Sequence, residues 1–329
     1  MPSAAQETVI ADSLDGVDLH NYKIQQASSP QDVLRQRRGR NAAGRPAAQE
    51  EDGGARRGPG VVFWEDAPQV LKFNRFIRSG YRAGYSYPQC LASLWGLHNE
   101  TGNIWTHLLP AVALAMVALG GLERPWAHAG VAYAVTTGSI VGCFVLSVCY
   151  HCFMGCHRDY KTWLTLDVCG VYLALLGSQW IAVEWGFPCH PALRLWGNAI
   201  YYALGIPGLA LSCLAGSPLR RGLPMLLMTA VRVCLLILRW AIAQGSAVAM
   251  RHYWAMEALV FVGGVVNVCR WPERWQPAPG PRKAALLDHW GNSHQIMHVC
   301  VAAGMLLVHR ALGEDAGEAF RAGVECAAR

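Results

Sequence analysis

Long apolar blocks alternate with short polar breaks over most of the chain. From about residue 104 onward, the apolar stretches reach the roughly 20 residues that a helix needs to cross a bilayer. Seven of them are predicted to span a membrane: residues 104–122, 129–152, 163–184, 195–215, 223–243, 252–270 and 293–312. The pattern predicts an all-α membrane protein built as a seven-transmembrane helix bundle over residues 104–312.

The residues outside these blocks are polar or mixed. Residues 1–62 hold few large apolar side chains, and 28–60 are rich in Arg, Ala, Gly and Pro, so we expect a disordered tail that is free to bind a cytoplasmic protein partner. Residues 63–103 mix aromatic and basic side chains, which favours a cytoplasmic segment lying on the membrane surface. Residues 313–329 remain as a short lumenal or extracellular tail.

Composition agrees with a membrane protein. Hydrophobic residues make up 53% of the chain and charged residues only 15%, whereas soluble domains carry about 25% charged residues. The start of the chain lacks the basic and then apolar pattern of a secretory signal, so the first span is expected to direct insertion. The 12 cysteines lie mostly inside apolar blocks, where cysteine acts as a small hydrophobe, and no disulfide framework is expected.

Lysine and arginine at the helix ends predict the orientation, because cytoplasmic loops carry an excess of them. One set of loops holds Arg158, Lys161, Arg220, Arg221, Arg270, Arg274, Arg282 and Lys283, and the opposite set holds Arg124, Arg194 and Arg251. We therefore expect a cytoplasmic N-terminus and a lumenal or extracellular C-terminus. This orientation is the reverse of that of G-protein-coupled receptors and argues against that class.

Five polar residues are predicted to meet at one depth, just inside the cytoplasmic leaflet. Ser147 and His151 end the second span, Asp167 lies early in the third, and His294 and His298 begin the seventh. Residues four apart share one face of a helix. Ionisable groups inside a membrane are costly and are candidates for function by default.

Three imidazoles beside a carboxylate indicate a metal centre. Three protein ligands with one open position are typical of catalytic zinc, so His151, His294 and His298 are the predicted Zn²⁺ ligands. Asp167 would orient the attacking water or take its proton, and Ser147 would donate a hydrogen bond or contact substrate. The alternative is that these histidines are interfacial residues with ordinary hydrogen bonds. The remaining histidines, His107 among them, are expected to have no such role.

A second polar cluster lies deeper in the bundle. Arg232 and Arg239 are seven residues apart in the fifth span, and Glu257 lies in the sixth. Unpaired charge there would be expensive, so we predict an Arg239–Glu257 pair. Its role would be a structural ion pair or, alternatively, a contact for a lipid head group.

The sequence resembles the progestin and adipoQ receptor family. The resemblance is carried by "GLHNETGNIWTH", "SVCYHCFMGCH", "LDVCG" and "NVCRWPERW…DHWGNSHQIMHV", within residues 70 to 312. It implies seven membrane helices and zinc held by His151, His294 and His298, with Asp167 and Ser147 beside it. The segment after "WPERW" is longer here than the family pattern, with "QPAPGPRKAALL" before Asp288.

The resemblance also implies a function. It favours a zinc-dependent lipid amide hydrolase of the ceramidase type, with a ceramide-like membrane lipid as substrate and the Golgi membrane, or else the plasma membrane, as its location. One alternative is a receptor for a lipid, steroid or protein ligand. Its predicted lumenal loops, such as "ERPWAHAG" and "EWGFPCHPALR", are short for a protein ligand. A second alternative is a protein in which zinc is purely structural.

Overall fold

The computed structural model describes residues 60–120 and 129–327. Within them, seven helices are long and apolar enough to cross a membrane, which confirms the predicted architecture. They are α5 (Thr101–Leu119), α6 (Gly130–Phe153), α7 (Tyr160–Gly186), α8 (Pro191–Leu214), α9 (Pro218–Ala241), α10 (Ala247–Cys269) and α11 (Ser293–Ala327). The predicted tail lies outside these residues, apart from positions 60–62.

Three of these helices begin four or five residues earlier than predicted, and local chemistry explains why. Pro191 and Pro218 open α8 and α9, where a missing N–H costs nothing and the fixed φ suits a helix. The side chains of Ser217 and Ser246 cap α9 and α10 by accepting backbone N–H groups. The predicted spans began at the first long apolar run, one turn inside these signals.

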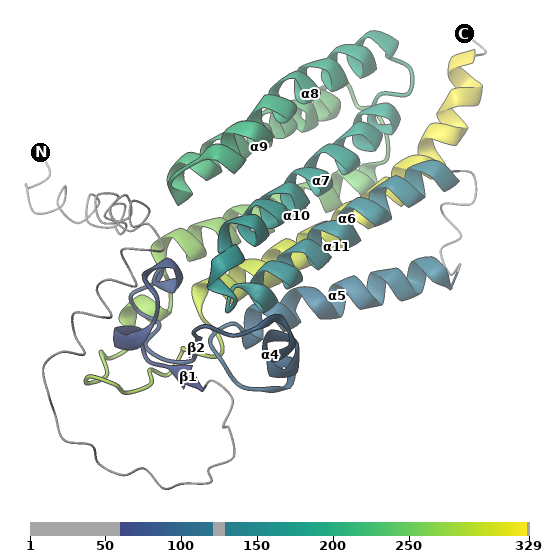
Figure 1. Cartoon of the computed structure of the whole chain (residues 1–329). Helices are drawn as coiled ribbons and strands as arrows, with labels where there is room; N and C mark the ends of the chain where they lie inside the picture. The colour runs from purple at the N-terminus through teal and green to yellow at the C-terminus, as the bar shows by residue number, and fades with distance from the viewer. Residues whose placement is uncertain (1–59, 121–128, 328–329) are drawn as a thin grey trace, which may run out of the picture. The chain divides into compact units, whose positions relative to one another are not determined.

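Helix α11 is the centre of the bundle, and it contacts α5, α6, α7 and α10 (Figure 1). Glycines allow close approach between neighbours, as expected for helices packed in lipid. Gly263 of α10 lies against Met297 and Cys300 of α11, and Gly170 of α7 lies against Cys143 of α6. The pair α8 and α9 lies on the other side of α7 from α6 in Figure 1.

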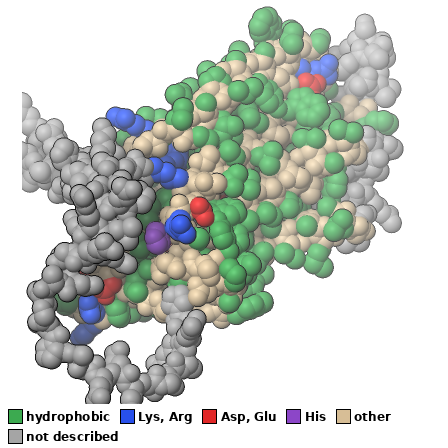
Figure 2. Space-filling view, viewed as in Figure 1, with side chains coloured by type: hydrophobic (Ala, Val, Ile, Leu, Met, Phe, Trp, Pro, Cys, Tyr) green, Lys and Arg blue, Asp and Glu red, His purple; other side chains and the backbone are tan. Residues whose placement is uncertain are grey.

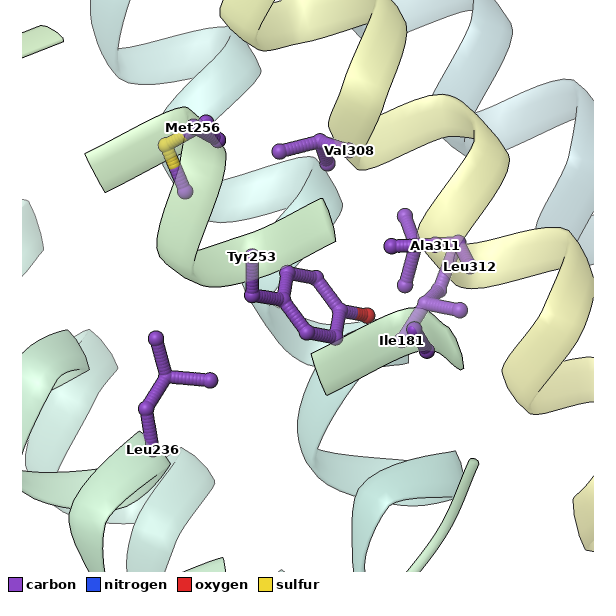
Figure 3. Close-up of a cluster of buried hydrophobic side chains, with 8 residues drawn as sticks. Ile181, Leu236, Tyr253, Met256, Val308, Ala311 and Leu312 are labelled. Atoms are coloured by element: carbon purple, nitrogen blue, oxygen red, sulfur yellow. The ribbon is translucent and has the colours of Figure 1, made fainter. Parts of the chain in front are cut away.

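One large buried apolar cluster joins α7, α9, α10 and α11. Figure 3 shows Tyr253 between Leu236 on one side and Ile181, Ala311 and Leu312 on the other. The outer surface is apolar as well: in Figure 2 hydrophobic side chains cover much of the visible bundle, and charged side chains gather toward its ends. A bundle with an apolar core and an apolar exterior suits a lipid environment.

Residues 60–100 form a small folded layer against one end of the bundle. It contains β1 (Val61–Val62) paired antiparallel with β2 (Tyr81–Arg82), the 3-10 turns η1 (Trp64–Asp66), η2 (Gln69–Leu71) and η3 (Ser93–Trp95), and helix α4 (Tyr87–Ala92). Leu71, Ile77 and Tyr81 pack on Tyr150 and Met154 at the end of α6. Their backbone and side chains therefore adjoin the helix end that carries His151.

Most cysteines whose side chains the structure describes are free. These ten lie mainly within or beside the helices: Cys90, Cys143, Cys149, Cys152, Cys156, Cys169, Cys213, Cys234, Cys269 and Cys300. Cys189, between α7 and α8, is disulfide-bonded. That connection lies at the end of the bundle opposite residues 60–100, because α7 begins beside them and runs away from them (Figure 1).

Candidate metal centre

Three histidines converge at the end of the bundle next to residues 60–100. His151 comes from the last turn of α6, and His294 and His298 come from the first two turns of α11. One ligand nitrogen from each lies within 4.8 Å of the others. His151 and His298 are buried and His294 is half-buried. The spacing of four places the two α11 histidines on one helix face, as predicted.

Each imidazole is oriented by a hydrogen bond from its Nδ1. His151 Nδ1 donates to Glu100 Oε2 (2.8 Å), and His294 Nδ1 donates to Asn267 Oδ1 of α10 (3.2 Å). His298 Nδ1 lies 3.2 Å from the Asn103 carbonyl oxygen, to which it donates. These bonds fix the tautomer and leave the Nε2 lone pair of each ring for a ligand, an arrangement found around metal-binding histidines.

Glu100 is the charged member of this supporting set. It is only 3% exposed and also accepts a hydrogen bond from Asn103 Nδ2 (2.6 Å). Burial alone raises the pKa of the carboxyl, but the bonds from His151 and Asn103 outweigh it and lower the pKa to about 2. Glu100 is therefore ionised at neutral pH and makes the His151 ring a stronger electron donor.

Ser147 and Asp167 lie beside the histidines, as predicted from their place in the spans. Ser147 is buried one helical turn before His151, and Asp167 of α7 lies close enough to interact with both residues. The Ser147 hydroxyl also lies 2.9 Å from His107 Nδ1. The partly exposed Asp167 carboxylate is thus held next to, but outside, the three imidazoles.

The donor set fits a metal ion. Three converging imidazoles, each oriented through Nδ1 and one of them supported by a carboxylate, are the kind of ligands that zinc and similar divalent cations accept. The arrangement can therefore bind a cation with an adjacent carboxylate and hydroxyl.

Sequence reasoning missed two residues of this site, Glu100 and His107. The His107 ring stacks on His298 with centroids 3.9 Å apart, so the expectation that it had no part near the centre is wrong. Glu100 is the N-cap of α5, which was predicted to begin at 104 instead of Thr101, and His107 was inside the predicted span but was expected to have no partner there. Positions 100, 103 and 107 share the spacing of one helix face, and this signal identifies Glu100, Asn103 and His107 together.

The deeper cluster is paired differently from the prediction. Arg232 forms a bidentate salt bridge with Glu257, in which Arg232 Nη2 lies 2.9 Å from Glu257 Oε2. Arg239 instead pairs with Asp315, its Nη1 lying 2.7 Å from Oδ2, so the predicted Arg239–Glu257 pair is wrong. Because α10 begins at Ala247, Glu257 lies nearer the middle of the bundle than expected, level with Arg232.

Asp315 was not predicted to lie in the bundle, because the apolar run of α11 ends at about residue 312 and the helix does not. The helix continues past residue 312 to Ala327 and carries Asp315 into the bundle, where it is fully buried. Its carboxylate also accepts hydrogen bonds from Tyr253 Oη (3.0 Å) and the Ser246 backbone N–H (3.1 Å). A cavity of about 30 Å³ lies beside both pairs, lined in part by Gln179, Arg232 and Arg239.

The fold and the histidine centre together define a seven-helix membrane protein with a candidate metal site at one end. Residues 95–309 match the model of the haemolysin-III-related family. The chain is 35% identical to progestin and adipoQ receptor family member 4 from Mus musculus over 274 residues, covering 78% of this chain and 94% of that protein. The Homo sapiens protein of the same name is also 35% identical, with the same coverage.

A more distant relative is the adiponectin receptor protein of Drosophila melanogaster, 29% identical over 78% of this chain and 60% of that protein. The chain therefore belongs to the haemolysin-III-related family and, within it, to the progestin and adipoQ receptor group. The resemblance to this family that the sequence motifs indicated is confirmed.

Proposed function

We propose that this protein is a zinc-dependent membrane lipid amide hydrolase of the ceramidase type, which controls ceramide levels. One observation carries the proposal. Three histidines with occupied Nδ1 atoms converge within 4.8 Å, inside an apolar bundle, directly beside a carboxylate and a hydroxyl. A structural site needs the ligands only, whereas an adjacent Asp167 and Ser147 supply what hydrolysis needs.

Each residue has a role in the proposed reaction. His151, His294 and His298 would hold a zinc ion, which when bound would polarise a carbonyl and lower the pKa of a water. Asp167 accepts the proton of the attacking water and passes it to the amide nitrogen as the C–N bond breaks. Ser147 would orient Asp167 or contact the substrate. The products are a fatty acid and a sphingoid base, with the apolar chains kept among the helices.

We further propose that the histidine end faces the cytoplasm, in the Golgi membrane or the plasma membrane. The basic loops lie at this end, which follows the positive-inside rule. The disulfide-bonded Cys189 lies at the opposite end, and disulfides persist in lumenal and extracellular compartments. On this orientation residues 1–62 are available to a cytoplasmic partner.

The experiment is release of fatty acid and sphingoid base from a panel of ceramides by purified, zinc-loaded protein. His298→Ala and Asp167→Ala are measured beside the native protein, with the zinc content of every sample. We expect release by the native protein, loss of both zinc and release in His298→Ala, and loss of release with zinc retained in Asp167→Ala.

His157→Ala provides the matched control, because His157 is exposed at the same end of the bundle. It should keep both zinc and activity. A native protein that is folded and zinc-loaded but releases nothing from any ceramide would overturn the hydrolase proposal.

A receptor is the second candidate, favoured by the names of the relatives, which are called receptors. The described connections at the end away from the histidines are short: four residues join α7 to α8, and five join α9 to α10. They leave little surface for a protein ligand, so a lipid or steroid is the better candidate. Ligand binding and hydrolysis are compatible, since one could regulate the other.

A purely structural zinc is the third candidate. It predicts that Asp167→Ala leaves every measurable property unchanged, and that a fourth protein ligand closes the coordination. X-ray absorption spectroscopy of the loaded protein distinguishes the two cases. Three nitrogen ligands with one exchangeable oxygen support hydrolysis, and a fourth protein ligand supports the structural role.

A further inference from the structure

The connection between α10 and α11, residues 270–292, buries its acidic side chains and exposes most of its basic ones. We call it the α10–α11 loop. It contains four basic residues, Arg270, Arg274, Arg282 and Lys283, and two acidic residues, Glu273 and Asp288. Its ends are joined to two membrane helices, so it lies at the bilayer surface next to the histidine centre.

Both carboxylates of this loop are fully buried and used internally. Glu273 accepts hydrogen bonds from Asn74 Nδ2 (3.0 Å) and from the Ser293 backbone N–H (2.7 Å). Asp288 accepts from the Ser79 hydroxyl (2.6 Å) and from the backbone N–H groups of Arg78 and Ala285 (2.7 Å each). Neither acid can neutralise a positive charge on the loop surface.

The basic and apolar side chains face outward instead. Arg274, Arg282 and Lys283 are exposed, and within the described part of the chain only Arg282 of the three forms an ion pair, with the exposed Asp66 at 3.1 Å. Beside these cations the loop exposes Trp275 (76%), Leu286 (85%), Trp271 and Trp290. Large apolar side chains next to cations at a membrane surface are typical of contact with lipid.

The loop is also held in shape. Gln276 donates from Nε2 to the Phe76 carbonyl (2.8 Å) and accepts from the Leu287 backbone N–H (3.0 Å), so it ties the loop to residues 60–100. A surface fixed in this way loses little conformational entropy when it binds. The α10–α11 loop is therefore held in one conformation, and its surface carries a net positive charge together with exposed apolar side chains.

We propose that the α10–α11 loop binds the head group of an anionic phospholipid in the adjacent leaflet. The phosphate and any further acidic group contact Arg274 and Lys283, while Trp275 and Leu286 insert among the lipid chains. A phospholipid presents negative charge directly above apolar chains, which matches this order of cations and exposed apolar side chains. The inference holds whether or not the protein hydrolyses lipid amides.

The test uses the full-length protein in phosphatidylcholine vesicles that contain a trace of spin-labelled phosphatidylserine or spin-labelled phosphatidylcholine. The fraction of each label immobilised by the protein gives a selectivity ratio. We expect a preference for phosphatidylserine of about threefold at low salt, falling toward one at high salt because exposed charges are screened. Equal immobilisation of the two labels at low salt would overturn the proposal.

Paired variants locate the effect. Arg274→Gln/Lys283→Gln should bring the ratio close to one, and Trp275→Ser/Leu286→Ser should reduce the immobilised fraction. The matched control, Arg251→Gln/Arg310→Gln, removes two exposed charges near the opposite end and should leave the ratio unchanged. Equal loss in the control, or full selectivity in the Arg274→Gln/Lys283→Gln variant, would contradict binding at this loop.

A competition experiment distinguishes a bound phospholipid from a bound soluble phosphate compound. Glycerophosphoserine at millimolar concentration carries the same head group without chains. It should not displace the spin-labelled lipid, because the apolar contacts are missing. Displacement at concentrations too low to act by ionic strength would identify the occupant as a soluble phosphate compound and would overturn the lipid proposal.

Discussion

Two buried polar clusters occupy this apolar bundle, and they differ in how far they satisfy themselves. Around Arg239 and Asp315 the charges are opposite and paired, and the carboxylate takes further hydrogen bonds from Tyr253 and Ser246. At the other end one ring nitrogen each of His151, His294 and His298 lies within 4.8 Å of the others. The first cluster pairs opposite charges, whereas the second gathers three like groups that one metal ion could bind together.

This difference indicates that the Arg239–Asp315 cluster stabilises the bundle and that the histidine cluster serves its function. Polar groups that satisfy one another inside a membrane protein fix the packing of helices. Imidazoles that are each held by a supporting hydrogen bond, and whose other ring nitrogens converge, are arranged to bind a ligand. The two clusters should therefore respond in opposite ways to substitution, and the following changes test this from the largest expected effect to the smallest.

Removal of one imidazole should have the largest effect on the histidine centre. We expect His294→Ala to lower zinc affinity by at least about 100-fold, because two protein ligands remain of three. Competition with a chromophoric chelator measures this. The thermal unfolding temperature of the metal-free protein should hardly change, and a large drop there would mean that His294 is structural.

Breaking the Arg239–Asp315 ion pair should have the opposite effect, lowering the stability of the protein but not its zinc affinity. Asp315→Ala leaves the Arg239 guanidinium buried without a counter-charge, which should cost about 3–5 kcal/mol of stability while zinc affinity stays the same. Unfolding in detergent by denaturant measures the loss. Arg239→Met/Asp315→Leu, which removes both charges, should recover most of it, and a double variant as unstable as the single one would refute a simple ion pair.

Glu100→Gln should weaken the hydrogen bond that orients His151 without removing a metal ligand, so it tests the histidine centre more finely. The amide is a poorer acceptor for His151 Nδ1 than a carboxylate, so we expect zinc affinity to fall about 10-fold. The rate of zinc release to a chelator should rise accordingly. Asn198→Asp, a change of similar size in the half-buried surface of α8, is the control and should leave zinc release unaffected.

The smallest effect concerns His98, which is fully satisfied as a neutral ring: Nε2 donates to the Ser93 carbonyl and Nδ1 accepts from the Glu100 N–H. Burial lowers its pKa from 6.5 to about 3. A neutral folded form contributes stability above pH 6.5 that is lost as the pH falls toward 3. The loss should reach about 1 kcal/mol at pH 5.5.

The measurement is thermal unfolding of the native protein and His98→Asn between pH 7.5 and 5.5. Asparagine keeps an acceptor near the position of Nδ1 but cannot be protonated, so its stability should depend less on pH. Identical slopes for the two proteins would show that His98 does not contribute to the acid sensitivity.

Much of this arrangement could be predicted from sequence. Apolar block length gives the seven helices, and the side of the bilayer from which each helix starts brings His151, His294 and Asp167 to one level. Those are properties of composition and topology alone. The resemblance to a family adds what the residues would do there.

The errors have a common physical origin at helix ends. Hydropathy marks where a helix enters lipid, not where its hydrogen bonding begins, so Glu100, at the N-cap of α5, was treated as surface. His107 was inside the predicted span but was expected to have no partner at its depth. The last turns of α11 with Asp315 were likewise left out, and Arg239 was given the wrong partner. Caps and side-chain spacing carry this information, and apolar run length does not.

Helix α11 joins the two clusters that differ so sharply. It carries His298 near its start and Asp315 seventeen positions later in one unbroken helix, a separation of about 25 Å. One continuous helix therefore contributes Asp315 to the cluster that holds the bundle together and two imidazoles to the candidate metal centre, at opposite ends of the same axis.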